Sequence, residues 1–319
     1  MSGLIECVPN VSEGRNRTHI AACGRAISSV PGVHVLDIHA DADHHRSVFT
    51  FVGPPNGVAN AVVRLAALAT TLIDLRRHRG EHPRMGALDV VPFIPLAGAT
   101  METCTEIARR VAQDLAGEHD LPVYLYGHAA QRADRHSLPD IRGRGFESLC
   151  ERGLADPMQR PDYGPHVLHP SAGATAVGAR DFLAAFNVLL QTPDVEIARR
   201  IARIIRTSSG GLPGVRALGF RVQGRAQVSM NLVDLRTTTP RLAFDAVQES
   251  AHHLGVEVMS SEIVGLLPSF AAAPDDAAHM RLDGSIESRT LEHRMAEAGW
   301  RWAPVASGDV RPPSAPERW

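Results

Sequence analysis

Lysine is absent from this chain of 319 residues, so all 33 of its lysine-plus-arginine positions are arginine. A GC-rich genome is the simplest explanation of this bias. Without lysine the chain cannot form a lysine Schiff base, hold pyridoxal phosphate through a lysine or supply a P-loop lysine. Arginine, in contrast, is well suited to bidentate recognition of carboxylates.

Strong net charge, long apolar runs and paired cysteines are missing as well. The formal net charge of −2 favours neither nucleic acid nor an anionic membrane as a partner. No apolar run approaches the ~20 residues that span a bilayer. The N-terminus "MSGLIECVPN" lacks the basic and apolar segments of a signal peptide. Four scattered cysteines without a CxxC pair predict a reduced, cytoplasmic protein.

The spacing of apolar residues predicts two α/β halves. In the first half we expect strands near 4–9, 33–39, 46–52 and 90–94, helices near 15–29 and 57–78, then a helix at 101–118 and a strand at 122–126. In the second half we expect strands near 182–190, 215–222, 226–233 and 256–264, with helices near 194–206 and 240–254. Both halves follow the order β-α-β-β-α-β, which predicts an α/β (α+β) fold of two ferredoxin-like subdomains. Their expected bounds are 1–180 and 181–302, and the proline-rich residues 303–319 are expected to form a disordered tail.

The stretch "GEHPRMGALDVVPFIP" at 80–95 joins a histidine to an apolar run. Pro83 biases His82 toward extended backbone, so the imidazole is expected on a loop before the strand. Prolines within the run predict an edge strand or an early strand end. Asp89 enters a buried run and needs a partner such as Arg84 or a backbone donor. On residue chemistry alone, His82 fits either a catalytic base or a hydrogen-bonding spacer in a turn.

A histidine- and aspartate-rich stretch, "LDIHADADHHRS" at 36–47, is the candidate metal site. It is similar to the HxHxDH zinc motif of metallo-hydrolases, with aspartate at the second ligand position. Its candidate ligands are His39, Asp41, Asp43, His44 and His45, and the spacing of His119, His166 and His169 does not fix any of them as a further ligand. The alternative is a polar β-turn between two strands.

Three further segments carry candidate ligand contacts. Residues 161–180, rich in glycine and proline, are too irregular for a helix or strand and predict either a ligand loop or an interdomain linker. Asn10, at the end of the first strand, suits a helix cap or a ligand contact. Polar residues alternate at Gln227, Ser229 and Asn231, which suits either a strand that lines a cleft or a solvated sheet face.

Long motifs of this chain resemble the glutamate formimidoyltransferase family. They are "ECVPNVSEGRN", "DADHHRSVFTFVG", "GEHPRMGALDVVPFIP", "PVYLYG", "LPDIRGRGFESL", "PDYGPHVLHPSAGATAVGARDFLAAFNV", "AQVSMNLVD" and "EIVGLLP", in the order typical of the family across residues 3–270. The resemblance implies two α/β subdomains with a substrate cleft between them. It also implies a monofunctional protein without the cyclodeaminase domain found in vertebrate members.

The resemblance further implies a reaction and its residues. The formimino group of N-formimino-L-glutamate would move to N5 of tetrahydrofolate, the co-substrate, in histidine degradation, without a metal. His82 of the HPRMG motif would be the general acid/base, and a homodimer is expected. The implied substrate and folate contacts are Asn10, Arg46, Arg84, Tyr163, Gly164, Pro165, His166, His169, Pro170 and Arg180.

One position departs from the family pattern. His39 stands where vertebrate members carry aspartate, so the role of that acid is either relaxed here or passes to Asp37 or Asp41. Three other hypotheses stay open beside formimino transfer. They are formyl transfer between 5-formyltetrahydrofolate and glutamate, folate binding without turnover, and a metallo-hydrolase built on the histidine-rich stretch.

Overall fold

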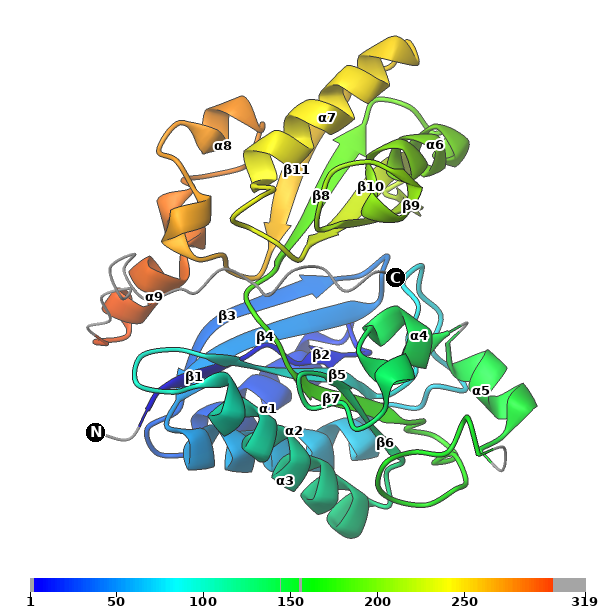
Figure 1. Cartoon of the computed structure of the whole chain (residues 1–319), viewed down its shortest axis with the longest axis vertical. Helices are drawn as coiled ribbons and strands as arrows, with labels where there is room; N and C mark the ends of the chain where they lie inside the picture. The colour runs from blue at the N-terminus through cyan, green and yellow to red at the C-terminus, as the bar shows by residue number, and fades with distance from the viewer. Residues whose placement is uncertain (1–2, 144, 155–156, 301–319) are drawn as a thin grey trace.

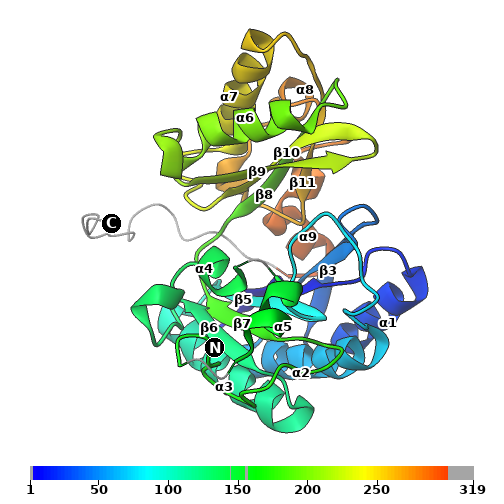
Figure 2. The same ribbon diagram turned by 90° about the vertical axis from the view of Figure 1, so that its right-hand side faces the viewer.

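The protein, seen in a computed structural model that describes residues 3–143, 145–154 and 157–300, has two β-sheets with helices on their outer faces. Figures 1 and 2 show the two sheets facing each other across the middle of the molecule. The predicted α/β class is confirmed. The expected tail at 303–319 lies outside the described residues, and the domain bounds at 180 and 181 stay a prediction.

The N-terminal sheet has the strand order β3-β4-(β1, β2)-β5-β7-β6, where β1 and β2 form one interrupted strand between β4 and β5. The strands are β1 (Ile5–Cys7), β2 (Asn10–Val11), β3 (His34–Asp41), β4 (Arg46–Gly53), β5 (Leu88–Pro95), β6 (Val123–Gly127) and β7 (Thr175–Ala179). Three helices cover its outer face: α1 (Arg17–Ser28), α2 (Pro55–Leu72) and α3 (Met101–His119).

The C-terminal sheet has the antiparallel order β11-β8-β10-β9. Its strands are β8 (Ala184–Leu190), β9 (Val215–Val222), β10 (Arg225–Leu232) and β11 (Val258–Val264). Helices α6 (Val195–Ile205) and α7 (Pro240–His253) pack on its outer face (Figure 2). Each half therefore contains the predicted order β-α-β-β-α-β.

Strand β5 is central, so the expectation of an edge strand is wrong. It pairs with β1 and β2 on one side and with β7 on the other. Pro92 is tolerated because the neighbouring strand is interrupted at that level. Between β1 and β2, the amide of Val8 bonds the carbonyl of Pro92 at 3.3 Å, while the carbonyl of Pro9 turns to Phe49 on β4. A proline in a central strand needs an irregularity of this kind.

The sequence predicted that residues 161–180 would form neither a helix nor a strand. This prediction is wrong for the end of the stretch, which forms β7. This strand lies between β5 and β6 and is parallel to both. Its sequence TAVGA has small side chains, and Gly178 leaves room for the Tyr126 ring, which would lie 2.6 Å from an added Cβ. The preceding loop-rich segment also holds η1 (Ala133–Arg135), α4 (Leu138–Arg142) and α5 (Phe146–Arg152).

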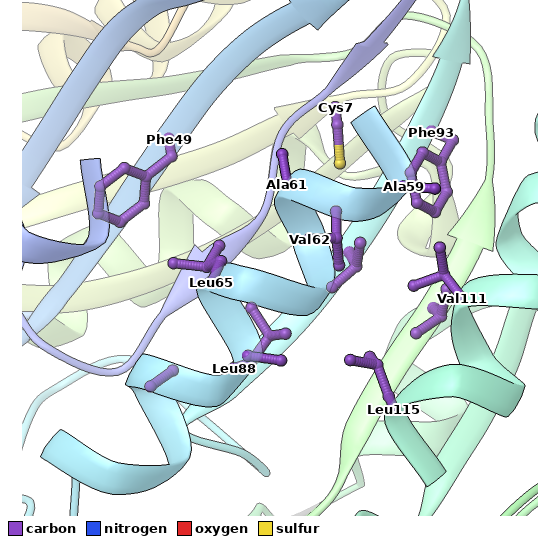
Figure 3. Packing of buried hydrophobic residues seen from close by; sticks show 14 of the residues in the cluster. Cys7, Phe49, Ala59, Ala61, Val62, Leu65, Leu88, Phe93, Val111 and Leu115 are labelled. Carbon is purple, nitrogen blue, oxygen red and sulfur yellow. The ribbon is translucent and has the colours of Figure 1, made fainter. Parts of the chain in front are cut away.

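Helix α2 ends at Leu72, earlier than the expected residue 78. Ile73 is extended, and the Leu75 amide donates to the carbonyl of Ser171 at 2.8 Å, which holds the following segment against the chain before β7. Figure 3 shows how α2 packs through Val62 and Leu65 into the main core beneath the N-terminal sheet. Each such side chain, when fully buried, stabilises the folded protein by about 1.5–3 kcal/mol.

The C-terminal segment joins the two halves beside the sheets (Figure 1). It contains η3 (Ser269–Ala271), α8 (Asp276–His279), η4 (Glu287–Arg289) and α9 (Leu291–Glu297), while η2 (Thr207–Ser209) follows α6. Leu291 and Met295 of α9 pack against Leu36 and Val52 of the N-terminal sheet. Among the described residues, no helix combines the length and apolar character needed to cross a bilayer.

Candidate active site

The loop at residues 78–84, between α2 and β5, lies against the turn that joins β3 to β4. The ring of His78 bonds the carbonyl of His45 (Nε2–O 2.8 Å). A Cβ added at Gly80 would lie 2.3 Å from the carbonyl oxygen of His44, so only glycine fits there without a shift of the backbone. The turn therefore fixes the loop that carries His82.

The His82 ring is half-buried and has a polar partner at each nitrogen. Nδ1 lies 2.7 Å from the carbonyl oxygen of Pro83, and Nε2 lies 2.7 Å from Nη1 of Arg46. A carbonyl only accepts and a guanidinium only donates, so this network assigns the proton to Nδ1 and the lone pair to Nε2. Burial first, then the charges of Arg46 and Arg142, holds the pKa of His82 well below its usual value. The imidazole is thus a neutral base at pH 7.

A buried set of charges supports this histidine. Asp89 is fully buried and accepts from the amide of Met85 and from Nη2 of Arg142, both at 2.7 Å. The predicted need for a backbone donor is confirmed, but the arginine partner is Arg142 rather than Arg84. Burial lowers the pKa of Arg46 to about 10, with the Arg142 charge acting in the same direction and Asp89 opposing.

Residues of the C-terminal sheet reach the His82 ring through His44. The ring centres of His44 and His82 are 5.8 Å apart, and Phe220 on β9 lies 5.3 Å from His44 and 6.1 Å from His82. Gln227 on β10 places its Nε2 3.1 Å from Nε2 of His44. The two halves therefore meet at the imidazole of His82.

Sequence reasoning singled out some of these residues for other reasons and missed others. His44 was a candidate metal ligand, and Gln227 belonged to the alternating polar face. Phe220 and Arg142 were missed: a phenylalanine on a strand and an arginine in a short helix carry no local signal of a site.

Two of the arginines expected to bind substrate have partners of their own. Arg84 forms a bidentate ion pair with Glu147, with both N–O distances 2.7 Å, and also donates to Nδ1 of His78 at 3.0 Å. Arg180 follows β7 and donates to the carbonyl of Asp181, at the opposite end of β5 from His82. Of the predicted arginines, the structure brings Arg46 into contact with His82.

The other predicted contacts do not touch His82 in this structure. Asn10, between β4 and β5, donates to the carbonyl of Val8 at 3.2 Å. Tyr163 lies beside the edge strand β6, where its carbonyl accepts from Val123, and Gly164 and Pro165 follow it. His166 and Pro170 are exposed, and Nδ1 of His169 caps its own turn by accepting from the amide of Ala172 at 3.0 Å.

The histidine- and aspartate-rich stretch forms the end of β3 and the turn to β4. Nε2 of His39 lies 4.0 Å from a carboxylate oxygen of Glu262 on β11, and the other oxygen accepts from Asn187 on β8 at 2.8 Å. In the part of the chain that the structure describes, no three His, Cys, Asp or Glu side chains are grouped to hold a metal. Burial lowers the pKa of His44.

Two cavities open where the halves meet. The larger, of about 560 Å³, is lined by the loop with Gly80 and Glu81 and by the β9–β10 turn. The smaller, of about 200 Å³, lies beside His39 and Glu262. Asp43 and Gln223 line both, and the carboxylate of Asp43 accepts from the amide of Gln223 at 2.8 Å. Gly80 and Glu81, which line the larger cavity, directly precede His82 in the chain.

Family models and individual relatives match this chain over most of its length. The model of the formiminotransferase domain, N-terminal subdomain, matches residues 4–180, and that of the formiminotransferase domain matches residues 185–282. Glutamate formimidoyltransferase of Thermoplasma acidophilum is 42% identical over 298 residues, which cover 92% of this chain and 98% of that protein. The protein of that name from Streptococcus pyogenes serotype M1 is 42% identical over 273 residues, with coverage of 85% and 91%.

A longer relative matches over part of its length. Formimidoyltransferase-cyclodeaminase of Mus musculus is 46% identical over 277 residues, which cover 84% of this chain and 51% of the mouse protein. Both halves of the chain, the sheets and the junction at His82 lie within these matches. The chain belongs to the formiminotransferase family of one-carbon transferases.

Proposed function

We propose that this chain transfers the formimino group of N-formimino-L-glutamate to N5 of tetrahydrofolate, as a step of histidine degradation, giving 5-formiminotetrahydrofolate and L-glutamate. The relatives named glutamate formimidoyltransferase support this reaction. The observation that carries the proposal is the neutral imidazole of His82, held by Pro83 and Arg46 where the two halves meet.

In the proposed reaction, N5 of tetrahydrofolate attacks the amidine carbon and forms the new carbon–nitrogen bond. The bond from that carbon to the glutamate nitrogen then breaks. One proton must leave N5 and reach the departing glutamate amine, so the atoms balance without an oxidant or a metal. His82 Nε2 is the proton carrier, because its lone pair is available once substrate replaces the contact with Arg46.

The protonation state of His82 suits this role. A base has to be neutral before it accepts a proton, and the lowered pKa keeps the imidazole neutral throughout the physiological range. The bond from Nδ1 to Pro83 fixes the ring so that Nε2 is the nitrogen that takes the proton. Holding two substrates in position supplies much of the remaining rate enhancement.

The test is an assay of purified protein with N-formimino-L-glutamate and tetrahydrofolate, which should form 5-formiminotetrahydrofolate. His82→Ala should lower kcat by roughly 10²- to 10⁴-fold, the usual contribution of a general base. His252→Ala, an exposed histidine at the end of α7, is the matched control and should keep full activity. Full turnover by His82→Ala would overturn the catalytic assignment.

The other hypotheses give different results in the same assay. Tight tetrahydrofolate binding without product would support a folate-binding protein. Product formed from 5-formyltetrahydrofolate and glutamate alone would support formyl transfer. Activity that is lost with a chelator and restored by zinc would support the metallo-hydrolase. A homodimer and folate contacts at residues 163–170 stay proposals that rest on the resemblance, and a cytoplasmic location stays a proposal that rests on the scattered cysteines.

A further inference from the structure

Arginine side chains gather in the larger cavity at the junction of the halves. Arg15 precedes α1, Arg79 belongs to the loop of His82, and Arg221 lies near the end of β9. A fourth, Arg84, is already paired with Glu147. The residues that line the cavity come from five separate parts of the chain, one of which is in the C-terminal half.

Three of these guanidinium groups have no carboxylate within ion-pair distance among residues 3–143, 145–154 and 157–300. Arg15 donates Nε to the carbonyl of Ala42 at 2.8 Å. Arg79 donates Nη1 to the carbonyl of His78 at 2.7 Å and, more weakly, to that of Arg76 at 3.3 Å. Neutral carbonyls orient a guanidinium but leave its positive charge uncompensated.

The carboxylates in the cavity do not balance these charges. Four arginines and three acids line it, and Glu147 is engaged by Arg84. Outside that pair, three arginines face two carboxylates, those of Glu81 and Asp43, and Asp43 accepts from the amide of Gln223, so one positive charge remains in excess. A ligand with two carboxylates would therefore find unpaired planar donors, which bind such groups in bidentate fashion.

The position of the cavity relates it to the reaction. Gly80 and Glu81 line it, and His82 is the next residue, with Nε2 bonded to Arg46. An amino-acid derivative anchored in the cavity would need to extend its substituent past Gly80 and Glu81 to meet that imidazole. The volume of about 560 Å³ leaves room for such a molecule.

We infer that this cavity binds the two carboxylates of the glutamate part of the donor and of the product L-glutamate, through Arg15, Arg79 and Arg221. This inference rests on the proposed function. Because Arg221 comes from the other half of the chain, bound glutamate links the halves across the cavity.

The test measures binding of L-glutamate by calorimetry, with and without saturating tetrahydrofolate, and binding of tetrahydrofolate by fluorescence. Arg15→Gln, Arg79→Gln and Arg221→Gln should each raise the Kd of L-glutamate roughly tenfold, because each removes a charge-assisted hydrogen bond. The Kd of tetrahydrofolate should not change. Arg109→Gln on the exposed face of α3 is the matched control.

The outcomes separate this inference from the proposed function. Unchanged glutamate binding in all three variants, or no glutamate binding to the unaltered protein in either condition, would overturn the inference. A weaker tetrahydrofolate complex with unaltered glutamate binding would also overturn it and assign the cavity to the folate tail. Glutamate binding that depends on the arginines, in a protein without transferase activity, would keep the inference and overturn the proposed function alone.

Discussion

At the scale of single residues, the central feature is a histidine placed beside an arginine that forms no ion pair with a carboxylate of the described residues. A carboxylate beside His82 would favour the imidazolium, whereas Arg46 at 2.7 Å and burial favour the neutral ring. The sequence pointed to His82 through its motif and to Arg46 as a substrate anchor. It could not show that the two touch, because their contact depends on the seating of the loop on the β3–β4 turn.

Replacing Arg46 tests this electrostatic effect. Arg46→Met removes a positive charge from His82, so the pKa of the imidazole should rise toward its usual value, although burial still lowers it. Because His82 is active when neutral, kcat/KM falls at low pH as the imidazole becomes protonated. In Arg46→Met this acid limb of the pH profile should move to higher pH. A limb that stays in place, or moves to lower pH, would contradict the role given to Arg46.

Glu6 on β1 offers a second test at this scale. Burial raises the pKa of this carboxyl from 4.5 to about 7, although the charge of Arg180 opposes the shift. Because the folded protein favours the protonated carboxyl of Glu6, the contribution of this group to stability is fully present below pH 4.5. It is lost as the pH rises through 7. The free energy of unfolding should drop by about 3 kcal/mol across that window.

Urea unfolding at pH 5 and pH 8 measures this loss. Glu6→Gln should abolish most of the pH dependence, because glutamine does not titrate. Glu249→Gln, at an exposed position on α7, should keep it. Equal pH dependence in Glu6→Gln and the unaltered protein would show that other groups are responsible.

At the scale of elements, apolar periodicity predicted the long helices and alternating strands such as β9 because each has one buried face, whereas short continuous apolar runs predicted β4 and β5, which are buried on both faces. It failed for β7, whose small residues TAVGA resemble a loop, and for the place of β5 in the sheet. Strand order depends on which edges pair, and local sequence carries little information on that. The accommodation of Pro92 needs the interruption between β1 and β2, which lies some 80 residues earlier in the chain.

The ion pair that fixes the start of β5 gives a prediction at this scale. Asp89→Asn leaves Arg142 without its charged partner in a buried site and should lower the free energy of unfolding by about 3–5 kcal/mol. Urea denaturation measures the change. Glu196→Gln, which removes the exposed pair with Arg199 on α6, should cost no more than about 1 kcal/mol. Similar losses in both variants would contradict this role of the buried pair.

At the scale of the whole molecule, the site exists only where both sheets meet. The N-terminal half supplies His82 and His44, and the C-terminal half covers their rings with Phe220 and bonds His44 through Gln227. The sequence predicted two halves and, through the family resemblance, a cleft between them. It did not show which side chains cross from one half to the other.

Phe220→Ala should separate assembly of the site from folding. The ring lies outside the buried core of the C-terminal half, so we expect thermal unfolding to change little. The imidazoles lose the ring that packs against them, and kcat should fall about tenfold or more. Leu218→Ala, two residues earlier on the same strand face and largely exposed, should keep both properties. An unchanged kcat in Phe220→Ala would show that His82 acts without this contact.

The position of β7 also constrains how the chain is made. Strands β5 and β6 leave the ribosome first, yet β7 lies between them and bonds both. Until residues 175–179 emerge, both neighbours keep an unpaired edge, which is a hazard for pairing with other chains. The segment at residues 128–174 therefore delays β7 relative to the two strands that it joins, and the N-terminal half completes its sheet only when synthesis reaches the start of the C-terminal half.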